Sequence, residues 1–241
     1  MGAFGQSGFD VRFEWGAEGA AALAPTSEIV VVVDVLSFCT AVDIAVARGA
    51  SVFPFLWRDN RAAHFARQAR AALAVDRRHT TPETPFSLSP GSLRSIPPGT
   101  GLVLPSPNGA AVTLAAARGG TAVMAGCLRN AAAVARTCHP YATVGVVAAG
   151  ERWGDGSLRP AVEDLIGAGA IITHLLDREL SPEARAALGA FRSVRPAVHL
   201  HSCSSGRELI EAGFGEDVTL AAQCDVSAVV PILREGAYVA R

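Results

Sequence analysis

The residues best suited to chemistry are acidic side chains that follow two expected strands. Asp34 directly follows the apolar run 29–33, and a second acidic group follows the apolar run 143–149. That second group comprises Glu151, Glu163 and Asp164. Ligands of open α/β sheets bind beyond the carboxyl ends of strands, and Mg²⁺ prefers carboxylate oxygens. We therefore expect a subset of these four acids to bind Mg²⁺ and to act in catalysis.

A structural reading of the same acids is open. Asp34 could bond only to the turn that follows it, and acids in the first turn of a helix can simply complement the helix dipole. The glycine-rich, charged stretch 150–159 favours the functional reading, because it follows a strand in a place where ligands gather.

Candidate anion-binding residues lie between expected strands and helices. Ser106-Pro-Asn108-Gly109 and Arg129-Asn130 each precede a helix, and free amides at a helix N-terminus bind anions. Ser37 and Thr40 follow Asp34 closely and are further candidates for substrate binding. The chain has 21 cationic residues and none is lysine. Arginine must therefore bind any second anionic group of a substrate, with Arg152 the first candidate and Arg129 or Arg77 after it.

Several phosphate chemistries are excluded. Without lysine there is no Walker phosphate loop and no Schiff base. The haloacid-dehalogenase pattern requires a second Asp two positions after the first, where this chain has Leu36. None of the five cysteines is followed six positions later by Arg, as cysteine phosphatases require. Cys39 remains the least favoured alternative, as a nucleophile without an adjacent His or Arg to lower its pKa.

The expected elements alternate between strand and helix, which favours an α/β fold with a mostly parallel or mixed sheet, helices on both faces and three layers. The expected strands are 29–33, 51–55, 101–104, 121–126, 143–149, 218–221 and 229–233. The expected helices are 40–48, 58–73, 108–117, 130–138, 160–176, 182–192 and 205–212. His199 and His201 alternate as on a strand or an irregular turn. We expect one domain over 1–241, with two lobes joined by the proline-rich stretch 80–107 as the alternative.

Composition limits the partners. A formal net charge of −1 argues against nucleic acid, and the apolar run 29–33 is too short to cross a membrane. With widely spaced cysteines and no signal peptide, a cytoplasmic location is expected. A homodimer is allowed for, and the expected partner is a small anionic phosphoester.

In the order and spacing of its motifs, the chain resembles the 2-phosphosulfolactate phosphatase family. The resemblance runs from about residue 29 to residue 233 and is carried by Val33-Asp34-Val-Leu36, Asn108-Gly109, Gly150-Glu151-Arg152, Glu163-Asp164, Ser205-Gly206-Arg207 and Val230-Pro231. It differs at Ser37, where many members have Arg. The resemblance implies a cytosolic, Mg²⁺-dependent phosphatase that converts 2-phosphosulfolactate to 3-sulfolactate and phosphate in coenzyme M biosynthesis. The rival hypothesis is a non-catalytic protein that binds a small anion or metabolite on the same scaffold.

Overall fold

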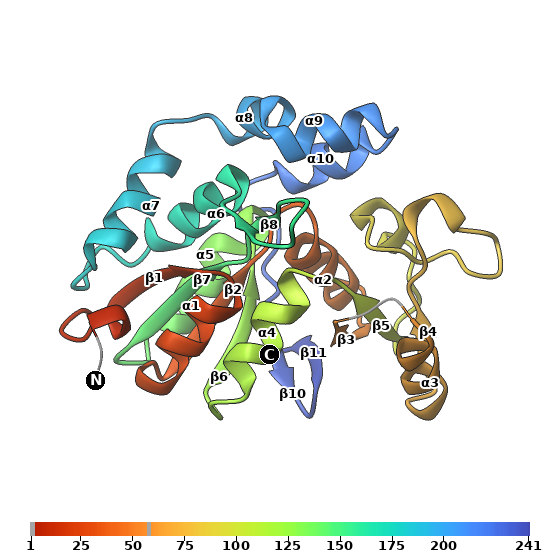
Figure 1. Cartoon of the computed structure of the whole chain (residues 1–241), viewed down its shortest axis with the longest axis horizontal. Coiled ribbons are helices and arrows are strands. Elements are labelled where there is room, and N and C mark those ends of the chain that lie inside the picture. The colour runs from red at the N-terminus through yellow and green to blue at the C-terminus, as the bar shows by residue number, and fades with distance from the viewer. Residues whose placement is uncertain (1–2, 57–58) are drawn as a thin grey trace.

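One nine-stranded mixed sheet forms the centre of the molecule (Figure 1). The computed structural model describes residues 3–56 and 59–241. Across the sheet, the strands are β1 (Val11–Trp15), β7 (Val144–Ala148), β2 (Ile29–Val33), β6 (Ala122–Gly126), β10 (Pro231–Arg234), β11 (Ala237–Ala240), β3 (Ser51–Phe55), β5 (Gly101–Pro105) and β4 (Ala72–Leu73).

Two parallel groups of strands flank an antiparallel hairpin. Strands β1, β7, β2 and β6 pair in parallel, as do β3, β5 and β4. The hairpin β10–β11 lies between the groups and pairs antiparallel with β6 on one side and with β3 on the other. The sheet is therefore mixed, as the sequence predicts.

Strand β2 explains why helices cover both faces. All five of its residues are buried. Ile29, Val31 and Val33 enter one core with helices α5 (Ala131–Cys138), α6 (Val162–Ile172) and α7 (Pro182–Arg192). Val30 and Val32 enter a second core with α1 (Gly16–Leu23), α2 (Phe38–Ala47) and α4 (Gly109–Ala117). Because successive side chains of a strand point to opposite faces, an unbroken apolar strand requires a helix layer on each side. The three-layer prediction is confirmed.

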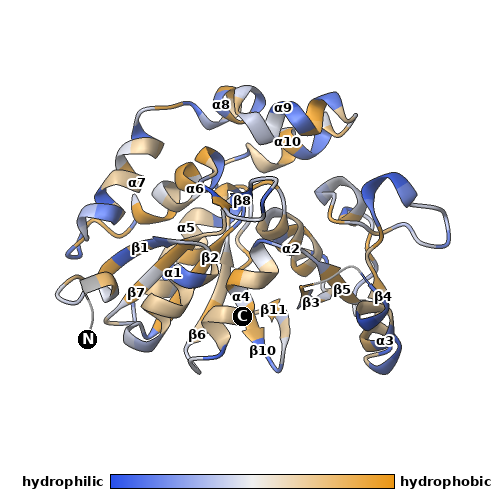
Figure 2. Cartoon of the chain, viewed as in Figure 1, coloured by the Kyte–Doolittle hydropathy of each residue, from blue (hydrophilic) through white to orange (hydrophobic). Residues whose placement is uncertain are grey.

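The hydropathy of the elements follows this layering (Figure 2). The central strands are mainly hydrophobic, whereas polar residues gather on outer elements such as α3 (Asn60–Gln68). Within the described ranges 3–56 and 59–241, no helix is long and apolar enough to cross a bilayer.

Three short helices lie above the strand ends in Figure 1: α8 (Pro196–Ser202), α9 (Ser204–Glu211) and α10 (Gly215–Ala221). The strand predicted over 218–221 is wrong, because these residues belong to α10 and bury Val218 and Ala221, which lie three positions apart. An apolar run of four residues does not distinguish strand from helix. The expected strand or turn at His199 and His201 is also wrong, since both lie in α8.

The segment between α3 and β5 departs from the βα alternation. The helix predicted over 58–73 begins at a residue outside the described ranges; the described helix, α3, ends at Gln68, and Arg70 takes a positive φ of 51° before β4 begins. Two 3-10 helices follow: η3 (Arg77–His79) lies just before the proline-rich stretch, and η4 (Pro90–Leu93) lies within it. We call residues 74–100 the excursion. The strands before and after it belong to the same sheet.

Candidate active site

A cavity of about 270 Å³ lies where the segments after β2 and β5 meet α9. Its walls come from five separate parts of the chain. The lining residues are Asp34, Leu36, Ser37, Arg77, Leu88, Ser106, Pro107, Asn108, Glu151, Ser205, Glu208 and Leu209. Asp34, Asn108 and Glu151, which were predicted to follow three separate strands, thus line one cavity.

Asp34 joins the N-terminal ends of two helices. Its Oδ1 accepts a hydrogen bond from Phe38 N at 3.0 Å, and its Oδ2 accepts one from Gly109 N at 2.9 Å. Phe38 begins α2 and Gly109 begins α4. A Cβ on Gly109 would lie 2.7 Å from Asp34 Oδ2, so this close approach requires glycine. The pKa of Asp34 is raised to about 7: burial is the main cause, the charges of Glu151 and Glu163 add to it, and the hydrogen bonds from the Phe38 and Gly109 amides oppose it.

Asp164 joins the loops that follow β2 and β7 in the same way, by accepting backbone hydrogen bonds from both. Its Oδ1 accepts from Val35 N at 2.7 Å and its Oδ2 from Gly150 N at 2.9 Å. Gly150 has a φ of +68°, a conformation that favours glycine. Burial raises the pKa of Asp164 well above its ordinary value, and the neighbouring charges of Asp34 and Glu163 add to this. Asp164 and Asp34 therefore hold the site's loops together while repelling each other.

Glu151 and Glu163 complete the group of acids. Glu151 lies in the short hairpin formed by β8 (Glu151–Arg152) and β9 (Leu158–Arg159), and its Oε1 accepts from Asn108 Nδ2 at 2.7 Å. Glu163 is buried in the first turn of α6. Burial, then the charge of Glu163, raises the pKa of the Cys203 thiol to about 11. We call Asp34, Glu151, Glu163 and Asp164 the acidic cluster.

The donor chemistry of the acidic cluster fits Mg²⁺ held by few protein ligands. In the described part of the chain, no ion pair joins any of the four acids to an arginine or histidine. Also within those residues, no three acidic, histidine or cysteine side chains gather as a complete metal-binding group. Mg²⁺ usually takes one or two carboxylates and completes its shell with water and substrate oxygens. Asp34 and Glu151, which line the cavity, are placed for that arrangement.

The other predicted binding residues divide between the cavity and the protein interior. Ser37, Ser106 and Asn108 line the cavity, and Gly109 lies directly behind Asn108. Thr40 is fully buried, and its hydroxyl donates to Val35 O at 2.8 Å.

Arg129 and Asn130 lie outside the cavity lining and make structural contacts. Arg129 Nε donates to Asp43 at 2.9 Å, and its Nη1 donates to Leu220 O at 3.1 Å. The Asn130 amide bonds to the backbone at Cys127 and Val229.

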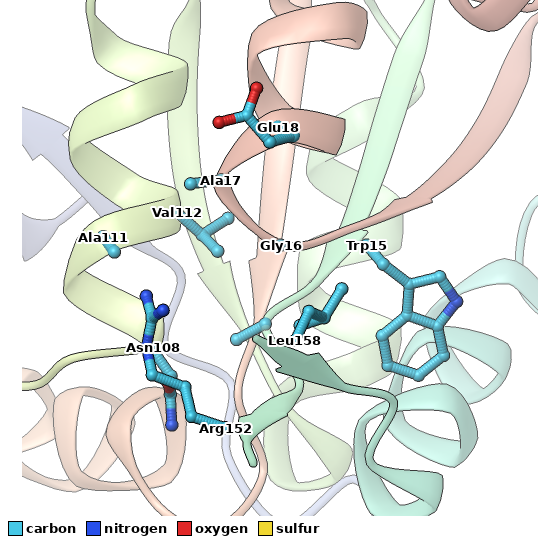
Figure 3. A pocket seen from close by; sticks show the side chains of 10 residues that line it. Trp15, Gly16, Ala17, Glu18, Asn108, Ala111, Val112, Arg152 and Leu158 are labelled. Carbon is cyan, nitrogen blue, oxygen red and sulfur yellow. The ribbon is translucent and has the colours of Figure 1, made fainter. Parts of the chain in front are cut away.

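Arg152 lines a different cavity, of about 220 Å³, which shares Asn108 with the first (Figure 3). Its guanidinium donates to Pro107 O at 3.1 Å and to Gly156 O at 2.9 Å. Figure 3 places it near Asn108, with Leu158 and Trp15 further along the same wall. Arg152 therefore braces the loops around the site and lies outside the lining of the Asp34 cavity.

The sequence did not predict all of the lining residues. It made Arg77 only a secondary candidate, and it gave no sign that Glu208 and Leu209 of α9 line the cavity. Ser205 entered through the resemblance alone; its hydroxyl accepts from Arg159 Nη2 at 2.9 Å. The helix predicted over 205–212 is α9, but an amphipathic surface helix gives no local sign that it covers a cavity, so its place at the site follows only from the fold.

The fold and this cavity describe an α/β protein whose acidic residues converge at the ends of parallel strands, where ligands of such sheets bind. The family model for 2-phosphosulpholactate phosphatase matches residues 19–236, nearly the whole chain. The chain belongs to the 2-phosphosulpholactate phosphatase family and is, by that membership, a phosphoric monoester hydrolase. The resemblance inferred from the motifs is confirmed.

Proposed function

We propose that the protein is a Mg²⁺-dependent phosphatase of a small phosphorylated acid, 2-phosphosulfolactate by family, which it hydrolyses to 3-sulfolactate and phosphate. Family membership supports the reaction class. One observation carries the rest: Asp34 and Glu151 face one cavity beside Glu163 and Asp164, with no ion pair to a described arginine or histidine. Buried acids of like charge are costly unless a cation compensates them.

The chain's own residues would bind and orient the phosphate. The N-terminal ends of α2 and α4 both point at Asp34, and their partial positive charge favours an anion in the adjoining space. Asn108 fixes the position of the Glu151 carboxylate by donating to it. In the metal-free chain, the pKa of Asp34 near 7 lets it hold or release a proton at neutral pH. Mg²⁺ held by Asp34 and Glu151 would supply charge neutralisation at the phosphoryl oxygens and a water of lowered pKa.

The test is phosphate release from a panel of 2-phospho acids that includes 2-phosphosulfolactate, with Mg²⁺ and with EDTA. Wild type should release phosphate only with Mg²⁺, and Glu151→Gln should lose the activity. Glu216→Gln, in an exposed side chain paired with Arg94, is the matched control and should behave as wild type. Release that is equal in EDTA, or none from any substrate of the panel, would contradict the proposal.

A non-catalytic anion-binding protein is the second candidate. It is favoured by the absence of a complete three-ligand metal group among residues 3–56 and 59–241. It predicts that phosphorylated acids raise the melting temperature without any phosphate release. Turnover by wild type that Glu151→Gln abolishes would exclude it.

A further inference from the structure

The charges that line the cavity are unequally distributed. Asp34, Glu151 and Glu208 are acidic, and Arg77 is the one cationic side chain among the described lining residues. An acid substrate that carries a phosphate and a second anionic group needs favourable charge at two points. The acidic cluster with its cation would serve the phosphate, which leaves Arg77 as the charge available to the other group. Guanidinium groups suit carboxylate and sulfonate oxygens because they donate two parallel hydrogen bonds.

Three contacts, one from the start of α2 and two from α10 and the residue before it, fix the position of Arg77. Its Nη2 donates to Ser37 Oγ at 2.9 Å, at the start of α2. Its guanidinium carbon lies 5.8 Å from the centroid of the Phe214 ring, just before α10. Its Nε lies 3.6 Å from Asp217 Oδ2 in α10. The side chain is 21% exposed, so it is held firmly yet reaches the cavity.

Asp217 is a buried acid that contacts both Arg77 and the excursion. Its Oδ1 accepts from Ser89 Oγ at 2.6 Å and from Gly91 N at 3.0 Å, which ties the excursion to α10. Its Oδ2 is buried, accepts no hydrogen bond from the described residues and faces Arg77. The charge of Asp217 thus holds the guanidinium at the cavity wall through an ion pair longer than a hydrogen bond.

We propose that Arg77 is the specificity-determining residue of the reaction: with the Ser37 hydroxyl it binds the second anionic group of the substrate, and Asp217 is its positioning residue. The inference rests on the proposed function and deepens it by naming the residue that selects substrates with an anionic group besides the phosphate. Arg129 and Arg152 are not alternatives, since neither lines this cavity.

The kinetic test compares 2-phosphoglycolate, which carries a carboxylate, with ethyl phosphate, which does not. In Arg77→Gln, kcat/KM for 2-phosphoglycolate should fall about 10- to 100-fold, mainly through KM, as expected for one lost charge-assisted contact. The value for ethyl phosphate should stay within about twofold, because uniform loss would indicate a general defect. Arg77→Lys should lie between wild type and Arg77→Gln. The matched control, Arg94→Gln, removes an exposed arginine of the same excursion and should change neither substrate.

The role of Asp217 is tested by the same comparison of kcat/KM between 2-phosphoglycolate and ethyl phosphate. Asp217→Asn should raise KM for 2-phosphoglycolate with kcat unchanged, and the double variant with Arg77→Gln should lose no more than Arg77→Gln alone. Independent losses that multiply would overturn the positioning role, since contacts acting through one residue are not additive.

A binding measurement separates this inference from the proposed function. Isothermal titration with sulfoacetate, which has two anionic groups and no phosphoester, should show binding that Arg77→Gln weakens about tenfold or more and Arg94→Gln preserves. If no phosphoester is hydrolysed but this pattern holds, the phosphatase proposal fails and the role of Arg77 stands. If Arg77→Gln keeps both the substrate preference and sulfoacetate binding, the role of Arg77 is overturned. If Arg77→Gln does not melt cooperatively, Arg77→Lys is used in its place. An unchanged preference of Arg77→Lys for 2-phosphoglycolate over ethyl phosphate overturns the inference, and a reduced preference supports it.

Discussion

Two buried aspartates nine positions apart are compensated in opposite ways. Asp43 in α2 is fully buried and bonds to Arg129 Nε at 2.9 Å and to Ser227 Oγ at 2.6 Å. Asp34 accepts only backbone amides and has other acids as its charged neighbours. Burial raises the pKa of both, but at Asp43 the arginine and the hydroxyl oppose it, whereas at Asp34 Glu151 and Glu163 add to it.

Under the function that we propose, this difference separates a structural acid, Asp43, from a functional one, Asp34. A buried pair such as Asp43–Arg129 is complete within the chain and links α2 to the segment after β6. The acidic cluster is incomplete in charge, which costs stability and is typical of sites that bind a cation or substrate. Burial and carboxylate chemistry alone do not distinguish these two roles; the charged neighbours do.

The largest expected effect is on activity at Asp34. Asp34→Asn removes the charge that faces the cavity, and phosphatase activity should fall about 10³-fold, as when a principal electrostatic contact to the reacting group is removed. Stability should not fall at neutral pH, because the substitution relieves repulsion with the neighbouring acids. Phosphate release and urea unfolding, measured on the same preparation, check both parts. Activity within tenfold of wild type would remove Asp34 from the reaction.

The second effect should fall on stability at Asp43. Asp43→Ala leaves Arg129 without its buried partner, so the free energy of unfolding should drop by about 3 kcal/mol. Activity per folded molecule should stay near wild type, because Arg129 lies outside the cavity lining. Glu211→Ala breaks an exposed pair with Arg207 and is the control, with an expected loss of about 0.5 kcal/mol or less. An inactive but stable Asp43→Ala protein would contradict the assignment.

The sequence predicts this fold well where patterns are local and strong. The unbroken apolar run 29–33 required a strand covered on both faces, and the alternation after it placed most helices within a few residues. It missed β1, α1, α8 and β11, which lie in short or weakly patterned segments near the chain ends or between helices. These elements are specified by packing against the sheet more than by their own periodicity.

The site was predictable only in part for a related reason. The acids after β2 and β7 converge because parallel strands end at a common edge, which a sequence pattern can indicate. The arginine was harder to predict, because Arg129 and Arg152 follow expected strands, whereas Arg77 follows only an expected helix. Only the folding of the excursion over α2 and α10 places Arg77 at the cavity. Contacts between residues 40 to 140 positions apart leave no local sign.

The third prediction concerns pH in the metal-free protein. The pKa of Asp34 is raised from 3.8 to about 7, so between about pH 4 and pH 7 the folded chain keeps a proton that the unfolded chain has lost. Stability should therefore fall as the pH rises through this window, by up to about 1.4 kcal/mol per pH unit for one proton. Urea unfolding of wild type and Asp34→Asn in EDTA measures the difference. If the two proteins have the same pH slope, the Asp34 carboxyl titrates normally.

The smallest effect is expected at Cys39, which lies between the two aspartates in the chain. Its thiol is buried and donates to Val32 O at 3.2 Å, and burial, with the charge of Asp34, raises its pKa well above the ordinary value. A nucleophilic cysteine requires an accessible thiolate, so Cys39→Ala should keep phosphatase activity within about twofold, and iodoacetamide should not inhibit the folded enzyme. Loss of activity in Cys39→Ala with an unchanged melting temperature would instead place the thiol in the reaction. That outcome would mean that Asp34 serves to orient the neighbouring Cys39 thiol. Asp34 and Asp43 would then differ in the group that each one positions, and not in how their charges are compensated.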